Sequence, residues 1–133
     1  MCTAATYKTK DFYFGRTLDY EFSYNEEVTI TPRNFKFKLR NGRVLENHYA
    51  IIGMSYISNN YPLYYDGTNE KGLSIAGLNF VGNAYYRDYI EGKNNICQFE
   101  LIPYLLGTCS NINEVRKELE NINITNEAFN NNL

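Results

Sequence analysis

The first 57 residues contain runs of β-branched and aromatic residues in which apolar and polar side chains alternate in places. A period of two is typical of a strand with one buried and one exposed face. We therefore expect strands within four segments, residues 2–9, 12–20, 26–40 and 43–57.

The clearest alternation lies just before Asn41 and Gly42. Three apolar residues alternate there with three cations, in the order Phe35, Lys36, Phe37, Lys38, Leu39 and Arg40. Asn-Gly supplies the positive φ angles of a two-residue hairpin turn, so we predict a hairpin with that turn. A nucleic-acid groove needs aromatics and cations on one surface, whereas alternation separates them. We interpret the cations as a solvated sheet face.

The pattern changes after residue 60. A turn cluster at residues 66–72 separates two strand-like runs and predicts a second hairpin with a longer loop. Residues 85–95 form a polar connection. Residues 96–109 are mostly apolar and predict a buried helix that is kinked or broken at Pro103.

The last third also predicts an amphipathic helix. Asn111 followed by Glu114 resembles a capping box, which is typical of a helix start. Val115, Leu119 and Ile122 then recur at helical spacing and would place one apolar stripe on a sheet.

Composition and charge narrow the class of protein. A chain of 133 residues with 44% hydrophobic residues predicts one domain, residues 1–133. The formal net charge of -2 gives no general attraction to nucleic acid or to anionic lipid. No apolar run approaches the roughly 20 residues of a membrane span, and the first residues do not resemble a signal peptide. We expect a cytoplasmic protein.

The chain has three cysteines, Cys2, Cys97 and Cys109, and one histidine, His48. An odd number of cysteines without a C-x-x-C pair argues against a disulfide framework and against a zinc site. We expect no metal and interpret Cys97 and Cys109 as buried small apolar residues.

Cys2 follows the initiator methionine directly. If Met1 is removed, one residue carries both a thiol and a free α-amine, and an α-amine can accept a proton near neutral pH. Such a nucleophile needs no histidine as its base. An ordinary second residue of an edge strand is the alternative reading of Cys2.

Five separated motifs, in order along the chain, resemble the choloylglycine hydrolase family, which includes bile salt hydrolases and penicillin V acylases. The motifs are CTAATYKTKD from Cys2, FGRTLD from Phe14, TPRNF from Thr31, DGTNEKGL from Asp66 and AGLNF from Ala76. The resemblance implies an α+β fold, the N-terminal nucleophile hydrolase αββα sandwich, of which this chain would be only the N-terminal half.

The resemblance also implies catalytic roles for four residues. Cys2 matches the nucleophile, Arg16 an active-site arginine, Asp19 the aspartate that holds the α-amine, and Asn79 an oxyanion-hole asparagine. Taken singly, Arg16 could be a surface strand residue, Asp19 a turn former and Asn79 an element terminator. On a regular strand Arg16 and Asp19 point to opposite faces, so a shared site requires a bulge or a strand end between them.

Five apolar residues near these motifs are core candidates by composition. By resemblance some of them line the pocket for a steroid or aromatic acyl group: Leu18, Phe22, Tyr24, Ile57 and Tyr65.

The implied function is a cysteine amidohydrolase without cofactor that cleaves glycine- or taurine-conjugated bile salts through a thioester on Cys2. The nearest alternative is a penicillin V acylase, but that group typically carries tyrosine where this chain has Asn79.

Chains of the family are much longer and supply a second asparagine and a second arginine to the active site from their later part. A second chain that supplies the rest of the fold is therefore one alternative, and we also expect a homo-oligomer. An inactive truncated fragment is a further alternative, and a tyrosine-rich β module that binds sugars is another.

Overall fold

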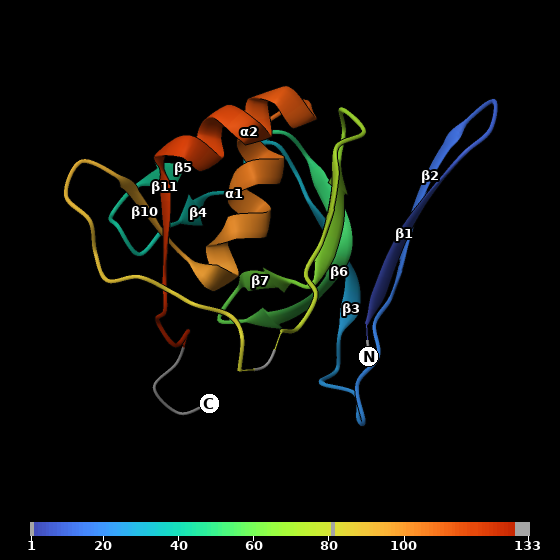
Figure 1. The fold of residues 1–133 in the computed structure, drawn as a ribbon, viewed down its shortest axis with the longest axis horizontal. Coiled ribbons are helices and arrows are strands. Elements are labelled where there is room, and N and C mark those ends of the chain that lie inside the picture. The colour runs from blue at the N-terminus through green and yellow to red at the C-terminus, as the bar shows by residue number, and fades with distance from the viewer. Residues whose placement is uncertain (1, 81, 130–133) are drawn as a thin grey trace.

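The structure, a computed structural model, describes residues 2–80 and 82–129 and combines small sheets with helices at the C-terminal side (Figure 1). Its elements in chain order are β1 (Thr3–Lys8), β2 (Phe12–Thr17), β3 (Glu27–Thr31), β4 (Phe37–Lys38), β5 (Val44–Leu45), β6 (Ile51–Ser58), β7 (Tyr61–Tyr64), β8 (Asp66–Asn69), β9 (Ser74–Ala76), β10 (Asn94–Cys97), the 3-10 helix η1 (Gln98–Glu100), α1 (Leu101–Thr108), α2 (Ile112–Asn121) and β11 (Ile122–Thr125).

A five-stranded antiparallel sheet forms the centre of the molecule. Its strand order is β3-β6-β8-β9, and β7 pairs with β6. Helix α1 lies on one side of this sheet, and the β1–β2 hairpin lies on the other (Figure 1). Two smaller pairs complete the described part, β4–β5 and the parallel pair β10–β11.

The main core lies between α1 and the sheet. Leu106 on α1 is fully buried. It packs against Gly67 of β8, where an added Cβ would lie only 3.0 Å from Cδ1 of Leu106. Small residues of the sheet thus let the helix approach closely. The buried apolar cluster comprises Phe37, Leu39, Ile51, Tyr64, Leu73, Ile96, Tyr104, Leu105, Leu106 and Cys109.

Asn69, at the end of β8, ties the C-terminal end of α1 to the sheet. Its side-chain nitrogen donates to the carbonyl oxygens of Leu106 and Cys109, both at 2.7 Å. Its side-chain oxygen accepts the backbone N–H groups of Lys71 and Leu73, both at 3.0 Å. The side chain is only 3% exposed, so these bonds satisfy a polar group that would otherwise be costly to bury.

Both predicted hairpins form, but with a turn that differs from the expected one. In β4–β5, Leu39 N–H donates to Arg43 and Gly42 N–H donates to Leu39, which encloses a three-residue loop. Gly42 has φ +84°, whereas Asn41 is not left-handed. A type I turn followed by a left-handed glycine is the common three-residue solution, so the Asn-Gly pair does not make a two-residue turn here.

The β8–β9 hairpin uses the same geometry. Asn69 N–H donates to Leu73, Gly72 N–H donates to Asn69, and Gly72 has φ +83°. Most of the predicted loop at residues 66–72 is therefore strand β8.

A two-residue turn occurs instead between β6 and β7, where the sequence analysis did not identify a hairpin. Asn59 and Asn60 have φ angles of 51° and 60°, and Ser58 pairs with Tyr61. Two consecutive left-handed residues are typical of a type I′ turn, and asparagine tolerates that conformation better than most residues.

The helices begin where their N-terminal groups can be satisfied. Pro103 lies in the first turn of α1, where the missing N–H costs nothing, so it neither kinks nor breaks the helix. The Asn111 side chain accepts the N–H groups of Asn113 and Glu114, which confirms the predicted start of α2. The predicted stripe is incomplete, because Leu119 is 45% exposed and Ile122 belongs to β11.

No helix in residues 2–80 and 82–129 has the length and apolar character to span a membrane.

Gly53 on β6 is predicted to tolerate no side chain. A Cβ there would lie 2.1 Å from the carbonyl oxygen of Asp66 and 2.6 Å from Gly67 Cα, which are backbone atoms of the neighbouring strand. We expect Gly53→Ala to lower the free energy of unfolding by about 3 kcal/mol. Chemical denaturation measures this loss. Gly15→Ala is the control, because its Cβ would meet nothing within 4 Å; equal losses in both variants would contradict the prediction.

Candidate active site

Cys2 and Arg16 lie on the same face of the β1–β2 hairpin. The register pairs Thr3 with Thr17 and Ala4 with Arg16. Cys2 directly precedes β1, and extending the strand alternation by one residue places its side chain on the face of Ala4 and Arg16, as the diagonal neighbour of Arg16. Diagonal neighbours on adjacent strands are within reach of a long side chain. The hairpin register therefore brings two of the predicted catalytic residues together.

The backbone of Asp19 lies beside Cys2, just beyond the end of β2. The strand stops at Thr17, and the Cys2 thiol then lies 3.9 Å from the carbonyl oxygen of Asp19. Thr3 N–H donates to Thr17 Oγ1 at 3.1 Å and closes the hairpin at this end. β2 ends at a strand end and not at a bulge, so the alternation that would place Arg16 and Asp19 on opposite faces does not extend to Asp19.

The Arg16 side chain connects the hairpin to the five-stranded sheet. Its Nη2 donates to the carbonyl oxygen of Gly77 at 2.5 Å, and its Nε lies 3.4 Å from Oδ2 of Asp66. The side chain is only 7% exposed. Nε and Nη1 are buried and make no hydrogen bond to any described residue. Arg16 is therefore a buried cation with an acidic partner, and the surface reading considered for it is wrong.

Asn79 lies two residues beyond the Gly77 carbonyl that Arg16 holds. It lines a cleft of about 480 Å³ together with Asp19, Tyr20, Glu21, Phe22 and Tyr24. The cleft joins the segment after β2 to the segment after β9. Asp19 and Asn79, 60 positions apart in the sequence, thus share one surface.

Aromatic rings form one wall of this cleft. The ring centroids of Tyr20 and Tyr24 are 5.4 Å apart, those of Phe22 and Tyr24 are 4.8 Å apart, and those of Tyr20 and Tyr65 are 5.9 Å apart. Three of the five predicted pocket residues therefore meet in one cluster. Phe22 remains 61% exposed, which leaves apolar surface open to a ligand.

The other two predicted pocket residues lie differently. Leu18 is half-buried and lies between the strand end and Asp19. Ile57 is on β6 opposite Pro62, is 42% exposed, and is not among the residues that line this cleft.

Tyr20 is a site residue that sequence reasoning missed. Burial raises the pKa of its hydroxyl, nearby Cys2 raises it further, and the Arg16 guanidinium opposes the shift. The available signal was an aromatic residue directly after Asp19 within the motif.

The loop that presents Phe22 and Tyr24 is fixed by Glu26. Its Oε2 accepts the Ser23 hydroxyl and the Tyr24 N–H, both at 2.8 Å. A hydrogen bond from its own backbone N–H, followed by those from Ser23 and Tyr24, holds the pKa of Glu26 below its ordinary value, so it is a carboxylate at neutral pH. Asn25 takes a left-handed conformation, with φ 61°, that turns the chain back toward β3.

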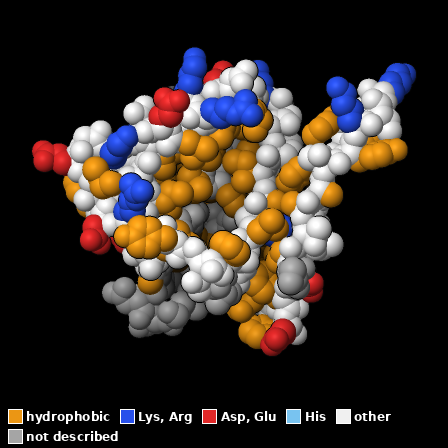
Figure 2. All heavy atoms as spheres, in the orientation of Figure 1, with side chains coloured by type: hydrophobic (Ala, Val, Ile, Leu, Met, Phe, Trp, Pro, Cys, Tyr) orange, Lys and Arg blue, Asp and Glu red, His pale blue; other side chains and the backbone are white. Residues whose placement is uncertain are grey.

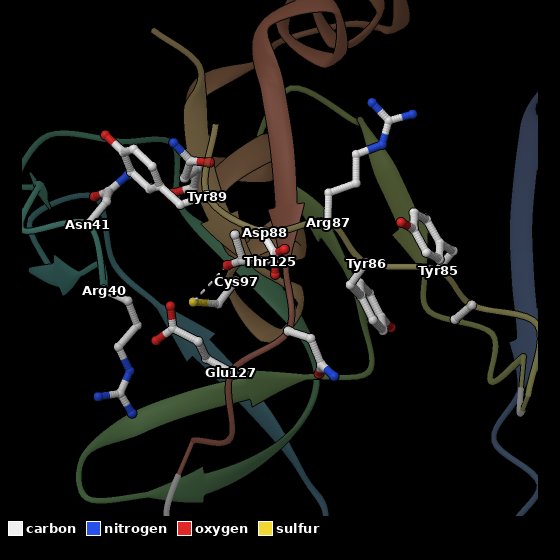
Figure 3. Close-up of a pocket in the computed structure, with 13 residues that line it drawn as sticks. Arg40, Asn41, Tyr85, Tyr86, Arg87, Asp88, Tyr89, Cys97, Thr125 and Glu127 are labelled. Atoms are coloured by element: carbon white, nitrogen blue, oxygen red, sulfur yellow. Dashed lines mark hydrogen bonds between the residues drawn. The ribbon is translucent and has the colours of Figure 1, made fainter. Parts of the chain in front are cut away.

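A larger cavity of about 680 Å³ lies away from Cys2 (Figure 3). Arg40, Glu127 and Cys97 are among the residues that line it, and Thr125 donates to the Cys97 sulfur at 3.6 Å. Burial raises the pKa of the Cys97 thiol to about 11, so this sulfur is protonated at neutral pH. A protonated thiol is a poor nucleophile, so we assign no catalytic role to the sulfur in this cavity.

The histidine is equally unsuited to serve as a base for Cys2. Both ring nitrogens of His48 lie 2.7 Å from carbonyl oxygens, those of Tyr49 and Phe35. The ring also packs against Phe37 in the core, with centroids 4.9 Å apart. Within the described ranges, no cluster of three or more His, Cys, Asp or Glu residues could hold a metal ion.

Curated relatives of similar sequence are bile salt hydrolases. Bile salt hydrolase/transferase from Lactiplantibacillus plantarum is 54% identical over 129 residues, covering 97% of this chain and 40% of the relative. The protein of the same name from Clostridium perfringens is 41% identical over 137 residues, covering 100% of this chain and 42% of the relative. The chain thus spans about two fifths of the length of these relatives.

Solved structures agree with the sequence relatives. A cysteine-to-alanine variant of conjugated bile acid hydrolase from Clostridium perfringens matches with a TM-score of 0.90 and 40% identity, covering 100% of this chain and 42% of that one. This match confirms the predicted fold. The profile of the linear amide C–N hydrolases, choloylglycine hydrolase family, matches residues 2–133. The chain therefore belongs to the choloylglycine hydrolase family.

Proposed function

We propose that this chain is the nucleophile-bearing part of a cysteine amidohydrolase that cleaves glycine- or taurine-conjugated bile salts. One arrangement carries the proposal. The Cys2 thiol lies 3.9 Å from the backbone carbonyl oxygen of Asp19, and Asp19 and Asn79 line the same aromatic-walled cleft. The names of the relatives, bile salt hydrolase/transferase and conjugated bile acid hydrolase, support the choice of substrate.

The first half of the reaction forms a thioester. Removal of Met1 frees the α-amine of Cys2, which takes the thiol proton. The thiolate sulfur attacks the amide carbon, and the carbonyl π electrons move to the oxygen. The Asn79 side-chain amide donates a hydrogen bond to that oxyanion. When the C–N bond breaks, the α-ammonium returns its proton to the departing glycine or taurine nitrogen.

The second half hydrolyses the thioester. Water attacks the acyl carbon, the α-amine takes its proton, and the sulfur leaves as the thiolate, which is protonated again. Asp19 orients the α-amine, and the nearby Arg16 cation stabilises the thiolate form.

The aromatic cluster would bind the acyl part of the substrate. Phe22, Tyr24 and Tyr65 offer ring faces and edges to a rigid steroid, and Tyr20 adds a hydroxyl. Leu18 and Ile57 stay predictions as pocket residues.

The remaining part of the fold would come from sequence beyond this chain. The relatives are more than twice as long, so strands that extend the two sheets would lie on a partner segment or a second chain. The exposed rings of Tyr7, Phe12 and Tyr13 on the hairpin are among the surfaces available to it, and Figure 2 shows hydrophobic side chains along this hairpin. A homo-oligomer remains part of the proposal.

Selective modification of Cys2 is the first expected outcome. Cys97 and Cys109 are 2% and 1% exposed, and burial raises the pKa of both thiols. Cys2 is half-buried at the surface. We expect iodoacetamide at pH 7.5 to label Cys2 at least about tenfold faster than either buried thiol, as measured by peptide mass spectrometry. Labelling of Cys97 at the rate of Cys2 in the native protein would contradict this assignment.

Amide hydrolysis tests the function itself. We would co-express the chain with the later three fifths of the Lactiplantibacillus plantarum relative, which this chain does not match. Glycine or taurine release from glycocholate and taurocholate is expected. Cys2→Ala should reduce this release at least about 1000-fold.

Cys97→Ala is the matched control, since it removes a buried thiol outside the cleft. It should leave the release rate within about twofold. Hydrolysis of penicillin V in preference to both bile salts would support the acylase alternative. Absence of hydrolysis in a complex that assembles and carries a free Cys2 amine would refute the proposal for this chain.

A further inference from the structure

We propose that Asp66 is a positioning residue that fixes Arg16 against the Cys2 face of the hairpin. The inference rests on the proposed roles of Cys2 and Arg16, and it adds a residue to which the sequence motifs assign no role. Asp66 begins β8 and belongs to the five-stranded sheet, whereas Arg16 belongs to the β1–β2 hairpin. Their ion pair therefore spans the junction between the two sheets.

The Asp66 carboxylate is itself held in place. Its Oδ1 accepts the N–H of Met54 on β6 at 3.0 Å, which leaves Oδ2 directed at Arg16 Nε, 3.4 Å away. The side chain is 18% exposed. A carboxylate with one oxygen fixed to a neighbouring strand presents the other at a defined place, so it can orient a long, flexible side chain.

Arg16 needs such a partner because it is buried. Its other contact is the neutral carbonyl of Gly77, and Nε and Nη1 have no hydrogen-bond partner within the described residues. A guanidinium that is 93% shielded from water is held poorly by one carbonyl alone. Without the Asp66 charge, we expect the side chain to rotate toward solvent and away from its diagonal neighbour Cys2.

The same contacts set the distance between the two halves of the cleft. Arg16 precedes Asp19 by three residues, and Gly77 precedes Asn79 by two. The Gly77 N–H also donates to the Tyr65 carbonyl at 2.8 Å, directly before Asp66. Asp66 therefore acts through Arg16 on the nucleophile and on the segment that carries Asn79.

The rate of Cys2 alkylation by iodoacetamide tests the inference without any substrate. In the 133-residue chain at pH 7, we expect Asp66→Asn to lower this rate about threefold to tenfold, because the thiolate loses a fixed cation. Asp66→Glu keeps the charge and should recover at least half of the wild-type rate. A wild-type or faster rate in Asp66→Asn would overturn the proposal.

Glu70→Gln is the matched control. Glu70 also pairs with an arginine, Arg33, and also accepts a backbone N–H, that of Ala50 at 3.0 Å. It lines a separate cavity with His48 and Gly107. The Cys2 alkylation rate should stay within about 1.5-fold of wild type in this variant. A loss equal to that of Asp66→Asn would show a general effect of fold stability and would overturn the specific role.

A double-variant comparison separates positioning from a structural role. If Asp66 acts through Arg16, then Asp66→Asn causes no further loss of alkylation rate in an Arg16→Gln background. A further loss overturns the proposal. The double variant removes both buried charges together, so no unpaired charge stays buried. The comparison between Arg16→Gln and the double variant can therefore be made even if Asp66→Asn alone fails to fold. Arg16→Gln with the wild-type rate would also overturn it.

The outcome is independent of amide hydrolysis. If the proposed function fails, no bile salt is cleaved, yet the alkylation pattern still shows whether Asp66 fixes Arg16. If the positioning role fails, bile salt hydrolysis by the completed enzyme retains its dependence on Cys2 while Asp66→Asn leaves the alkylation rate unchanged.

Discussion

The buried guanidinium of Arg16 is the contact on which the geometry of the site depends. The β1–β2 hairpin is otherwise a separate two-stranded sheet, and such a pair has little stability of its own in water. Arg16 fastens it to β8 by an ion pair and to the chain after β9 by a hydrogen bond. Because Cys2 lies at the same end of the hairpin, the contact that joins the sheets also holds the end of the hairpin that carries the sulfur.

The other site residues lie just beyond strands rather than within them. Asp19 follows the end of β2, and Asn79 follows the end of β9. A strand directs its side chains alternately to its two faces, whereas the first residues beyond it are free to turn. The strands thus form a rigid support, and the short segments after β2 and β9 direct polar groups into one cleft. The aromatic cluster of Tyr20, Phe22 and Tyr24 occupies the same kind of segment.

Local patterns in the sequence predicted local structure well. The alternation before Asn41 predicted the β4–β5 hairpin, and Asn111 predicted the start of α2. Turn geometry was less predictable, because Asn-Gly suits both the two-residue turn and the observed three-residue loop. Pro103 was predicted to kink or break a helix, because the apolar pattern places it in the middle of residues 96–109. The observed helix α1 begins only at Leu101, since the residues before it form strand β10 and η1. The parallel partner of β10 is β11, 28 residues later in the chain, and a local pattern does not reveal such a pairing.

Within the site, the motifs identified Cys2, Arg16, Asp19 and Asn79, and the structure brings the backbone carbonyl of Asp19 close to the Cys2 thiol and Asp19 into a shared cleft with Asn79. The ion pair between Arg16 and Asp66 was not predictable from spacing. Its partners are 50 positions apart and lie in different sheets, so no periodicity relates them. Asp66 lay within a predicted turn. Aspartate is common in turns because its side chain bonds to the local backbone, so the turn alone accounted for an aspartate at this position.

Asn69 illustrates how strictly one neutral amide can be specified. Its nitrogen faces two carbonyl oxygens and its oxygen faces two N–H groups, so the two ends of the amide cannot be exchanged. Spontaneous deamidation to aspartate would set a negative oxygen against two carbonyl lone pairs at the end of α1. Chemical ageing at this one residue would therefore loosen the helix from the sheet while the reacting groups themselves remained intact.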